Sequence, residues 1–314
     1  MPAGRPYPAP RSGWYSRGAK RGTGQVTHPV KVLCDSCSDL PRELLTARGI
    51  DSIPLTVILG NEELKDGVDI TADQFYERVQ REKLAPRTSQ VTPAEYGLFF
   101  RRAVADGSEA VYIGLSSGLS GSMQSALLAA QEPELGGRVH VVDSLGASVG
   151  LGLMVIKAAD LAESGLPAAS IKDEIDRYRA RVCHVFTLNT LEFAARSGRV
   201  TRFSSIAAGV LDIKPVLNMD MEGHLVPFEK VRGRKKALNR LFEEMERLGA
   251  NPAGQRVGLC HAQDAVTAAE MAERFRTQYG AAEVVVGQIG ATIGSHVGPG
   301  CISIFFEGPV NRGY

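Results

Sequence analysis

The sequence lacks a long uninterrupted apolar run. A helix that crosses a membrane needs about 18 or more apolar residues in a row, and the candidate stretch 149–162 is interrupted by Gly150, Gly152, Lys157 and Asp160. The N-terminal residues also lack the apolar segment of roughly 7 to 15 residues that a secretory signal contains. We therefore expect a soluble, cytoplasmic protein with no transmembrane segment and at most transient membrane contact.

Two common nucleotide-binding motifs are also missing. No G-x-x-x-x-G-K-[ST] occurs, and no G-x-G-x-x-G follows a predicted strand. Such glycine-rich turns hold phosphates through backbone N–H groups at a helix start. We expect no bound cofactor, and if phosphoryl transfer is involved, the ATP should be bound by another protein.

An excess of basic residues is absent outside the N-terminus. Residues 1–29 contain five basic and no acidic residues among many Gly, Pro and Ser, which predicts a disordered basic tail. The other residues include 31 basic and 35 acidic ones, a net charge of −4. This balance does not favour a nucleic-acid partner.

The cysteine pattern does not favour a disulfide framework or a metal site. The chain has 5 cysteines, an odd number, and without a secretion signal we expect them to be reduced. Cys34 and Cys37 have the C-x-x-C spacing of a redox or metal site, but Asp35 and Ser36 between them are typical of a turn and a helix cap. No metal is expected.

From Val30 onward, predicted strands and helices alternate. This order is typical of an α/β protein with a Rossmann-like parallel sheet, whose ligands lie at the carboxyl ends of the strands. Gly165-Leu-Pro167 is a plausible boundary, so we predict an N-terminal α/β domain over 30–165 and a C-terminal α/β domain over 166–314. A predicted hairpin in the second domain suggests a mixed sheet there.

The most informative stretch is Ala110–Ser125. Its first residues predict a buried strand, Gly114–Gly121 is rich in Gly and Ser, and the residues from about Ser120 onward predict a helix. Backbone N–H groups, hydroxyls and the helix dipole at such a turn favour an anion. We therefore expect an anion site here.

The same stretch contains Gly114-Leu-Ser116-Ser-Gly118, which matches the G-x-S-x-G elbow of serine hydrolases. Catalytic partners would have to come from Asp212 or Asp264 together with His261 or His296. The predicted helix starts several residues after Ser116, however, whereas an elbow serine lies at the turn that begins its helix. A serine hydrolase or esterase remains an alternative on this evidence.

Three further segments contain candidate binding residues. Thr88-Ser89-Gln90 is a second hydroxyl cluster, predicted in the loop before a helix. His296 lies between glycines in a predicted flexible loop, and Arg199 follows a predicted helix end, where a cation is favourable.

Taken together, these segments resemble the DegV family of bacterial fatty-acid-binding proteins, the acyl-carrying subunits of fatty acid kinase. The resemblance extends from about Lys31 to Phe306. Its landmarks are Asp35-Ser-Cys-Ser-Asp39-Leu40, Lys65-Asp-Gly-Val-Asp-Ile70, Thr88-Ser-Gln90, Leu115-Ser-Ser-Gly-Leu-Ser-Gly-Ser122, Asp143-Ser-Leu-Gly-Ala-Ser-Val-Gly150, Ser197-Gly-Arg-Val200, Ile213-Lys-Pro-Val-Leu217, Lys230-Val-Arg-Gly-Arg-Lys235 and His296-Val-Gly-Pro-Gly300.

The resemblance implies a DegV-like fold of two α/β domains with a long-chain fatty acid between them. The carboxylate would be bound by Thr88, Ser120 and His296, with Arg199, Ser89 and Gly121 as further head-group or partner residues. A separate ATP-binding kinase subunit would phosphorylate the carboxylate for phospholipid metabolism, so the chain itself would have no catalytic residue. A lipid-responsive binding protein without a kinase partner is a further alternative.

Overall fold

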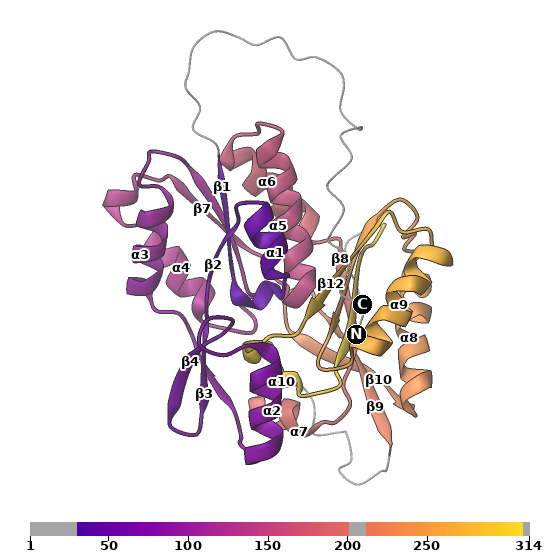
Figure 1. Cartoon of the computed structure of the whole chain (residues 1–314). Coiled ribbons are helices and arrows are strands. Elements are labelled where there is room, and N and C mark those ends of the chain that lie inside the picture. Colours follow the sequence, from indigo (N-terminus) through magenta and orange to yellow (C-terminus); the bar gives the residue numbers. More distant parts are fainter. Residues whose placement is uncertain (1–29, 201–211, 310–314) are drawn as a thin grey trace.

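The computed structural model describes residues 30–200 and 212–309, so the predicted basic tail at 1–29 lies outside the described residues. In Figure 1 the first half of the chain forms one lobe around a four-stranded sheet, ordered β2-β1-β6-β7. Every strand pair in it is parallel. Its strands are β1 (Lys31–Asp35), β2 (Asp51–Ile53), β6 (Ala110–Gly114) and β7 (Val139–Asp143). All five residues of β6 are buried, as expected for a strand covered on both faces.

Helices cover both faces of this parallel sheet. On one side α3 (Pro93–Ala103) packs against α4 (Ser122–Ala130), and on the other α5 (Ser148–Glu163) packs against α6 (Ala168–Arg179). The short helix α1 (Arg42–Ala47) follows β1. The expected parallel α/β arrangement is confirmed.

The second half of the chain forms a six-stranded mixed sheet, ordered β10-β9-β8-β13-β11-β12. Its strands are β8 (Val182–Thr187), β9 (Ile213–Met219), β10 (Leu225–Arg232), β11 (Arg256–His261), β12 (Glu283–Gln288) and β13 (Ile302–Glu307). The helices α8 (Arg234–Arg247) and α9 (Ala265–Thr277) pack against this sheet. The mixed sheet expected from the predicted hairpin is therefore present.

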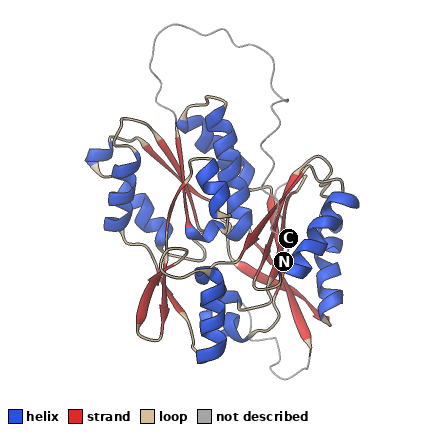
Figure 2. Ribbon diagram, viewed as in Figure 1, coloured by secondary structure: helices blue, strands red, loops and turns tan. Residues whose placement is uncertain are grey.

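Helix α5 lies between the two large sheets. It contacts β1 and β6 of the parallel sheet and β8, β11, β12 and β13 of the mixed sheet, and Figure 2 shows it between the strands of the two lobes. Residues Ser148–Ile156 are all buried, because a helix packed on two sides has no polar face to keep in water. The helix α6 beyond Gly165 still packs on β6 and β7.

A third, three-stranded antiparallel sheet was not expected from the sequence. It is ordered β4-β3-β5 and consists of β3 (Thr56–Leu59), β4 (Glu62–Lys65) and β5 (Arg87–Ser89). The apolar and β-branched residues over Ile53–Leu59 predict a single strand, but Pro54, which has no N–H to donate, separates β2 from β3. The two strands therefore join different sheets.

Three helices lie near the small sheet. Helix α10 (Ala291–Val297) contacts α2 (Ala72–Glu82), α7 (Glu192–Ser197), β3 and β5. Segments from both halves of the sequence therefore meet at α10. Capping boxes begin α2 at Thr71 and α3 at Thr92; the pattern Thr92-Pro-Ala-Glu95 predicts the second, and a cap alone is expected at Thr71.

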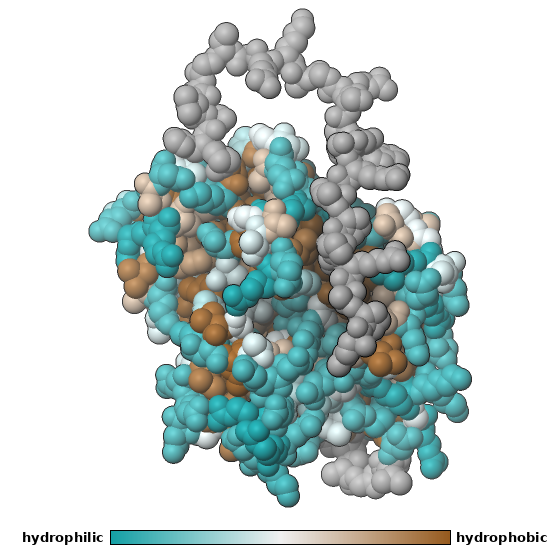
Figure 3. Space-filling model, in the orientation of Figure 1, coloured by the Kyte–Doolittle hydropathy of each residue, from teal (hydrophilic) through white to brown (hydrophobic). Residues whose placement is uncertain are grey.

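In the view of Figure 3 hydrophilic side chains cover most of the surface, and hydrophobic ones appear in separate patches. The exposed large apolar residues come from different elements: Val68, Leu98, Leu127, Leu128, Met221 and Val266. Among the described helices, none is long and apolar enough to cross a bilayer.

Candidate functional site

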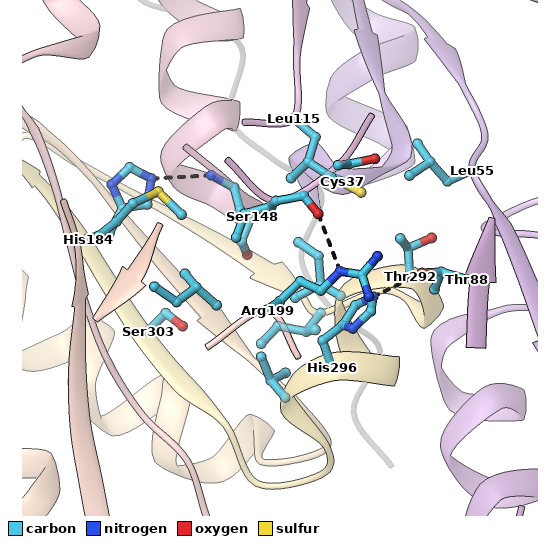
Figure 4. Close-up of a pocket in the computed structure, with 18 of the residues that line it drawn as sticks. Cys37, Leu55, Thr88, Leu115, Ser148, His184, Arg199, Thr292, His296 and Ser303 are labelled. Atoms are coloured by element: carbon cyan, nitrogen blue, oxygen red, sulfur yellow. Dashed lines mark hydrogen bonds between the residues drawn. The ribbon is translucent and has the colours of Figure 1, made fainter. Parts of the chain in front are cut away.

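A cavity of about 250 Å³ lies where the three sheets meet. Figure 4 shows the residues that line it, with Thr88, Arg199 and His296 together on one side and His184 and Ser303 on the other. All six residues expected at the head-group site line this cavity: Thr88, Ser89, Ser120, Gly121, Arg199 and His296. The fold thus brings together side chains that are far apart in sequence.

Ser120 and Gly121 lie in the loop between β6 and α4. The helix begins at Ser122, in agreement with the expected start at Ser120 or later, and Ser120 Oγ accepts a hydrogen bond from Ser122 N at 3.2 Å and donates to Ser122 Oγ at 3.1 Å. A Cβ atom at Gly121 would lie 2.1 Å from Gln90 Oε1. The absence of a side chain at Gly121 therefore lets this loop approach the Thr88–Gln90 segment.

Thr88 and His296 are in contact. The Thr88 Oγ1 and His296 Nε2 atoms lie 3.0 Å apart. Both surroundings differ from the sequence expectation, since Thr88 lies on strand β5 rather than in a loop and His296 lies on helix α10 rather than in a flexible glycine-rich loop. The prediction that Thr88 and His296 lie in loops was wrong, because the contacts that hold these segments in a strand and a helix come from residues distant in the sequence.

One of these distant contacts comes from Asp66. Its two carboxylate oxygens accept hydrogen bonds from Ala291 N and Thr292 N, each at 2.9 Å. These N–H groups have no partner within the helix, since they belong to its first turn. An acidic residue from the first half of the chain therefore caps α10 and fixes the helix that carries His296.

The electrostatic environment of His296 favours a neutral imidazole. Burial, together with the positive charge of Arg199, lowers the pKa of His296 to about 4. Within the described part of the chain, its Nδ1 atom is buried without a hydrogen-bond partner. The charge at this end of the cavity comes instead from Arg199, an exposed residue whose Nη1 donates to Ser197 O at 2.8 Å.

The rest of the cavity wall is largely apolar. Its apolar side chains are Leu55, Leu115, Leu119, Phe186, Met219, Leu225, Ile289, Ile293, Val297 and Phe305. Polar groups in the same wall bond to the protein: Ser148 Oγ donates to Asp39 Oδ2 at 2.6 Å, and His184 Nδ1 lies 3.1 Å from Val182 O. Sequence reasoning did not identify these wall residues, because their pattern is that of ordinary core.

The geometry around Ser116 does not support the hydrolase alternative. Ser116 is fully buried, and its Oγ donates to Gly223 O at 2.8 Å. The histidines proposed as its partners bond elsewhere, His296 to Thr88 and His261 Nδ1 to the backbone N–H of Asp264 at 3.3 Å. Ser116 therefore lacks the exposed Oγ and the adjacent base that a nucleophilic serine needs.

The cysteines are all free thiols, and each is buried. Burial raises the pKa of Cys34 to about 12, and a protonated thiol is a poor nucleophile and a poor metal ligand. Across 30–200 and 212–309, no three His, Cys, Asp or Glu residues come together as a metal site would require. These thiols therefore give no redox or metal site. The cavity has one end lined by hydroxyl and imidazole groups and an apolar interior.

Comparisons with known proteins identify the family. The family model described as "Uncharacterised protein, DegV family" matches residues 29–308. A DegV domain-containing protein of Deinococcus radiodurans is 35% identical over 283 residues, covering 88% of this chain and 98% of that protein.

Two solved structures have the same fold. A DegV family protein from Thermus thermophilus, described for its fatty acid binding, is 32% identical with a TM-score of 0.82, over 90% of this chain and 100% of that one. DegV from Bacillus subtilis, described as a fatty acid binding protein, is 28% identical with a TM-score of 0.79, over 89% of this chain and 99% of that one. The chain belongs to the DegV family, and its two α/β lobes have the DegV fold.

Proposed function

We propose that this protein binds a long-chain fatty acid in the cavity between its two lobes. The observation that carries the proposal is one cavity with neutral donors at one end, Thr88, Ser120 and His296, and an apolar wall over the rest. The carboxylate binds the donors, and the tail lies along the wall. The related structures from Thermus thermophilus and Bacillus subtilis, described as fatty acid binding, support it.

The energetics assign different roles to the two ends. Burying a sixteen-carbon tail contributes roughly 12 kcal/mol before ordering costs, at about 0.8 kcal/mol per CH₂. Hydrogen bonds from neutral donors to a carboxylate contribute about 1.5 to 3 kcal/mol each. The tail therefore provides most of the affinity, and the donors decide which end of the ligand lies beside Arg199.

We further infer that the bound carboxylate is presented to a separate ATP-binding kinase. Neutral donors leave the carboxylate more nucleophilic than a buried salt bridge would. The exposed Arg199 beside the site is suited to a partner's acidic groups or to phosphate. The acyl phosphate would then serve phospholipid synthesis in the cytoplasm, and this chain would carry no catalytic residue.

We also propose that the cavity lies between two domains, 30–165 and 166–314, although α6 of the second part packs on the parallel sheet of the first. Thr88, Ser120 and Ser148 come from the first part, and His184 and His296 from the second. Small movements between the two parts would change the shape of the cavity, which is a useful property in a carrier.

The central test is to identify and measure the ligand. Lipid extracted from the denatured protein should contain a long-chain fatty acid by mass spectrometry, and delipidated protein should bind palmitate. A preparation that neither carries nor binds a fatty acid would refute the proposal. Addition of the cognate kinase and ATP should give acyl phosphate, whereas binding without any phosphorylation would support the lipid-responsive alternative.

The head-group assignment has its own test. The double substitution Thr88→Val with Ser120→Ala should weaken palmitate binding roughly 100-fold or more, because it removes two donors to a charged group at about 1.5 to 3 kcal/mol each, and change thermal stability little. Ser117→Ala is the matched control, since this exposed serine does not line the cavity. Unchanged affinity in the double variant would show that the carboxylate binds elsewhere.

A further inference from the structure

The turn that joins β9 to β10, residues 220–224, crosses from the mixed-sheet lobe to the loop Ser116–Gly118 of the other lobe. Ser116 Oγ donates to Gly223 O at 2.8 Å. A Cβ atom at Gly118 would lie 2.8 Å from both Glu222 O and Gly223 O. Two backbone segments from opposite lobes are therefore in close contact at this point.

Both glycines are needed for this contact. Gly223 has φ +79°, and a Cβ atom there would lie 2.0 Å from Ser116 Oγ and 3.1 Å from Leu145 Cα. A larger residue at Gly223 would be strained and would push the turn away from the loop. The fit is thus specific to Gly at 118 and 223 and to a small hydroxyl side chain at 116.

The contact closes one side of the cavity. Met219 and Leu225 are paired across the hairpin next to the turn, and both line the cavity. On the other side of the contact, Leu115 and Leu119 flank the Ser116–Gly118 loop and line the same cavity. Separation of the turn from the loop would therefore expose the apolar interior.

The opposite side of the cavity is held more strongly. There, the carboxylates of Asp39 and Asp66 accept hydrogen bonds from the backbone N–H groups of residues 290–292, each at 2.9 Å. Three hydrogen bonds act on that side, against the single bond from Ser116 to Gly223, and each bond between neutral groups contributes about 0.5 to 1.5 kcal/mol. The turn is the side that opens at lower cost.

The hairpin next to the turn is at an edge of the mixed sheet and is irregular. Strand β10 is at the edge of the mixed sheet, and its pairing with β9 shifts register between Pro227 and Glu229. Such an irregularity bends a strand and weakens its ladder locally. The turn itself is organised by Asp220, whose Oδ1 accepts from Glu222 N and His224 N, each at 2.9 Å.

We propose that the β9–β10 turn is a latch on the acyl cavity, held shut by the hydrogen bond from Ser116 to Gly223, and that the fatty acid enters and leaves when this contact opens. The proposal rests on the proposed function, since it requires an acyl chain in the cavity. Ser116 is then a positioning residue: it makes no contact with the head group but holds the turn in place.

The test measures the release of bound palmitate. Protein loaded with palmitate is mixed with an excess of isotope-labelled palmitate, and native mass spectrometry follows the exchange. Ser116→Ala and Asp220→Ala should each release palmitate about 2 to 10 times faster, the factor expected for one neutral hydrogen bond. Ser117→Ala, in the adjacent exposed position, should exchange at the wild-type rate.

The double variant Ser116→Ala with Asp220→Ala tests whether the two residues act on the same contact or change the rate of palmitate release independently. If both residues act on one contact, the double variant should be no faster than the faster single variant, since coupled sites are not additive. The latch would be overturned if the effects of the two substitutions on the release rate multiply. It would also be overturned if both single variants load normally but exchange palmitate at the wild-type rate. Neither result would affect the proposed function. Wild-type protein that cannot be loaded with palmitate would overturn the proposed function and the latch with it.

A second measurement does not need the ligand. Hydrogen–deuterium exchange of the amides in 115–121 should become faster in Asp220→Ala, although this substitution lies in the other lobe. Unchanged exchange there would contradict the latch. Because Asp220→Ala leaves Ser116 and its loop intact, the test remains decisive even if Ser116→Ala folds poorly.

Discussion

Asp39 is a buried carboxyl group whose ionisation should cost the protein stability, and Asp39→Asn should remove this cost. Only 7% of the residue is exposed, and burial raises the pKa of Asp39 to about 8 from the ordinary 3.8. An asparagine suits the site, because it tolerates the φ of 48° found there. Its side-chain oxygen can still accept from Gly290 N, and its NH₂ group can donate to Ser148 Oγ.

The sign of the effect follows from proton binding. Between about pH 4 and 8 the folded protein retains the Asp39 proton while the unfolded chain has lost it, so the free energy of unfolding falls as the pH rises through this window. One pKa unit corresponds to 1.36 kcal/mol, which gives a ceiling of roughly 4 kcal/mol between pH 5 and pH 8. Entry of water near the carboxylate would reduce this, and we expect about 2 to 4 kcal/mol.

The assay is urea unfolding of both proteins at each pH from 5 to 9. Asp39→Asn should gain stability relative to wild type as the pH rises, with the gain levelling off above about pH 8. His296, whose pKa burial lowers to about 4, destabilises the fold as the pH falls from about 6.5, but this effect cancels in the difference. Asp51→Asn, at an exposed position on β2, controls for the change in net charge. A gain that is independent of pH, or that grows toward acid, would refute the reasoning.

Three further predictions concern the site mouth, the core of the second lobe and the thiols. Arg199→Gln should slow phosphorylation of bound palmitate by the kinase several-fold and affect palmitate affinity less, because a rim charge acts mainly on association; an equal loss in both would argue against partner recognition. Glu244→Ala should lower the free energy of unfolding in urea by about 1 to 2 kcal/mol, because the buried Glu244 bonds to Arg240 and Arg247 at 2.7 and 2.8 Å, while Arg240 keeps its bond to Glu229 at 2.6 Å; unchanged stability would contradict this. The buried cysteines should react with a thiol reagent within minutes only after unfolding, and rapid reaction of the native protein would show that the interior opens freely.

Local features of the site were predictable from the sequence. The strand β6 and the hydroxyl loop after it were identified from a β-branched run followed by Gly and Ser, and the capping box at Thr92 from its spacing to Glu95. These features depend on residues close in sequence, where spacing alone decides which groups can meet. The segments whose hydroxyl side chains line the cavity were therefore recognisable, including Thr88, although the prediction assigned Thr88 to a loop.

The surroundings of those side chains were not predictable in this way. Helix α10 depends on Asp66, which accepts from Ala291 N across 225 residues of sequence. The strand that carries Thr88 pairs with β3 of the small sheet, a sheet that the sequence did not predict. Such contacts depend on how distant segments pack. The G-x-S-x-G match suggested Ser116 as a nucleophile, but it did not indicate that Ser116 Oγ donates a hydrogen bond to Gly223 O.

By itself, the sequence determined the alternation of strands and helices, the caps, the hydroxyl-rich loop and the family, because each depends on short-range spacing or on a series of motifs in order. The tertiary structure alone decided that α5 lies between two sheets, that Thr88 and His296 meet 3.0 Å apart across 208 positions of sequence, and that Ser116 contacts the β9–β10 turn. The physical reason is that burial and charge at a site are set by every element packed around it. No short segment contains that information.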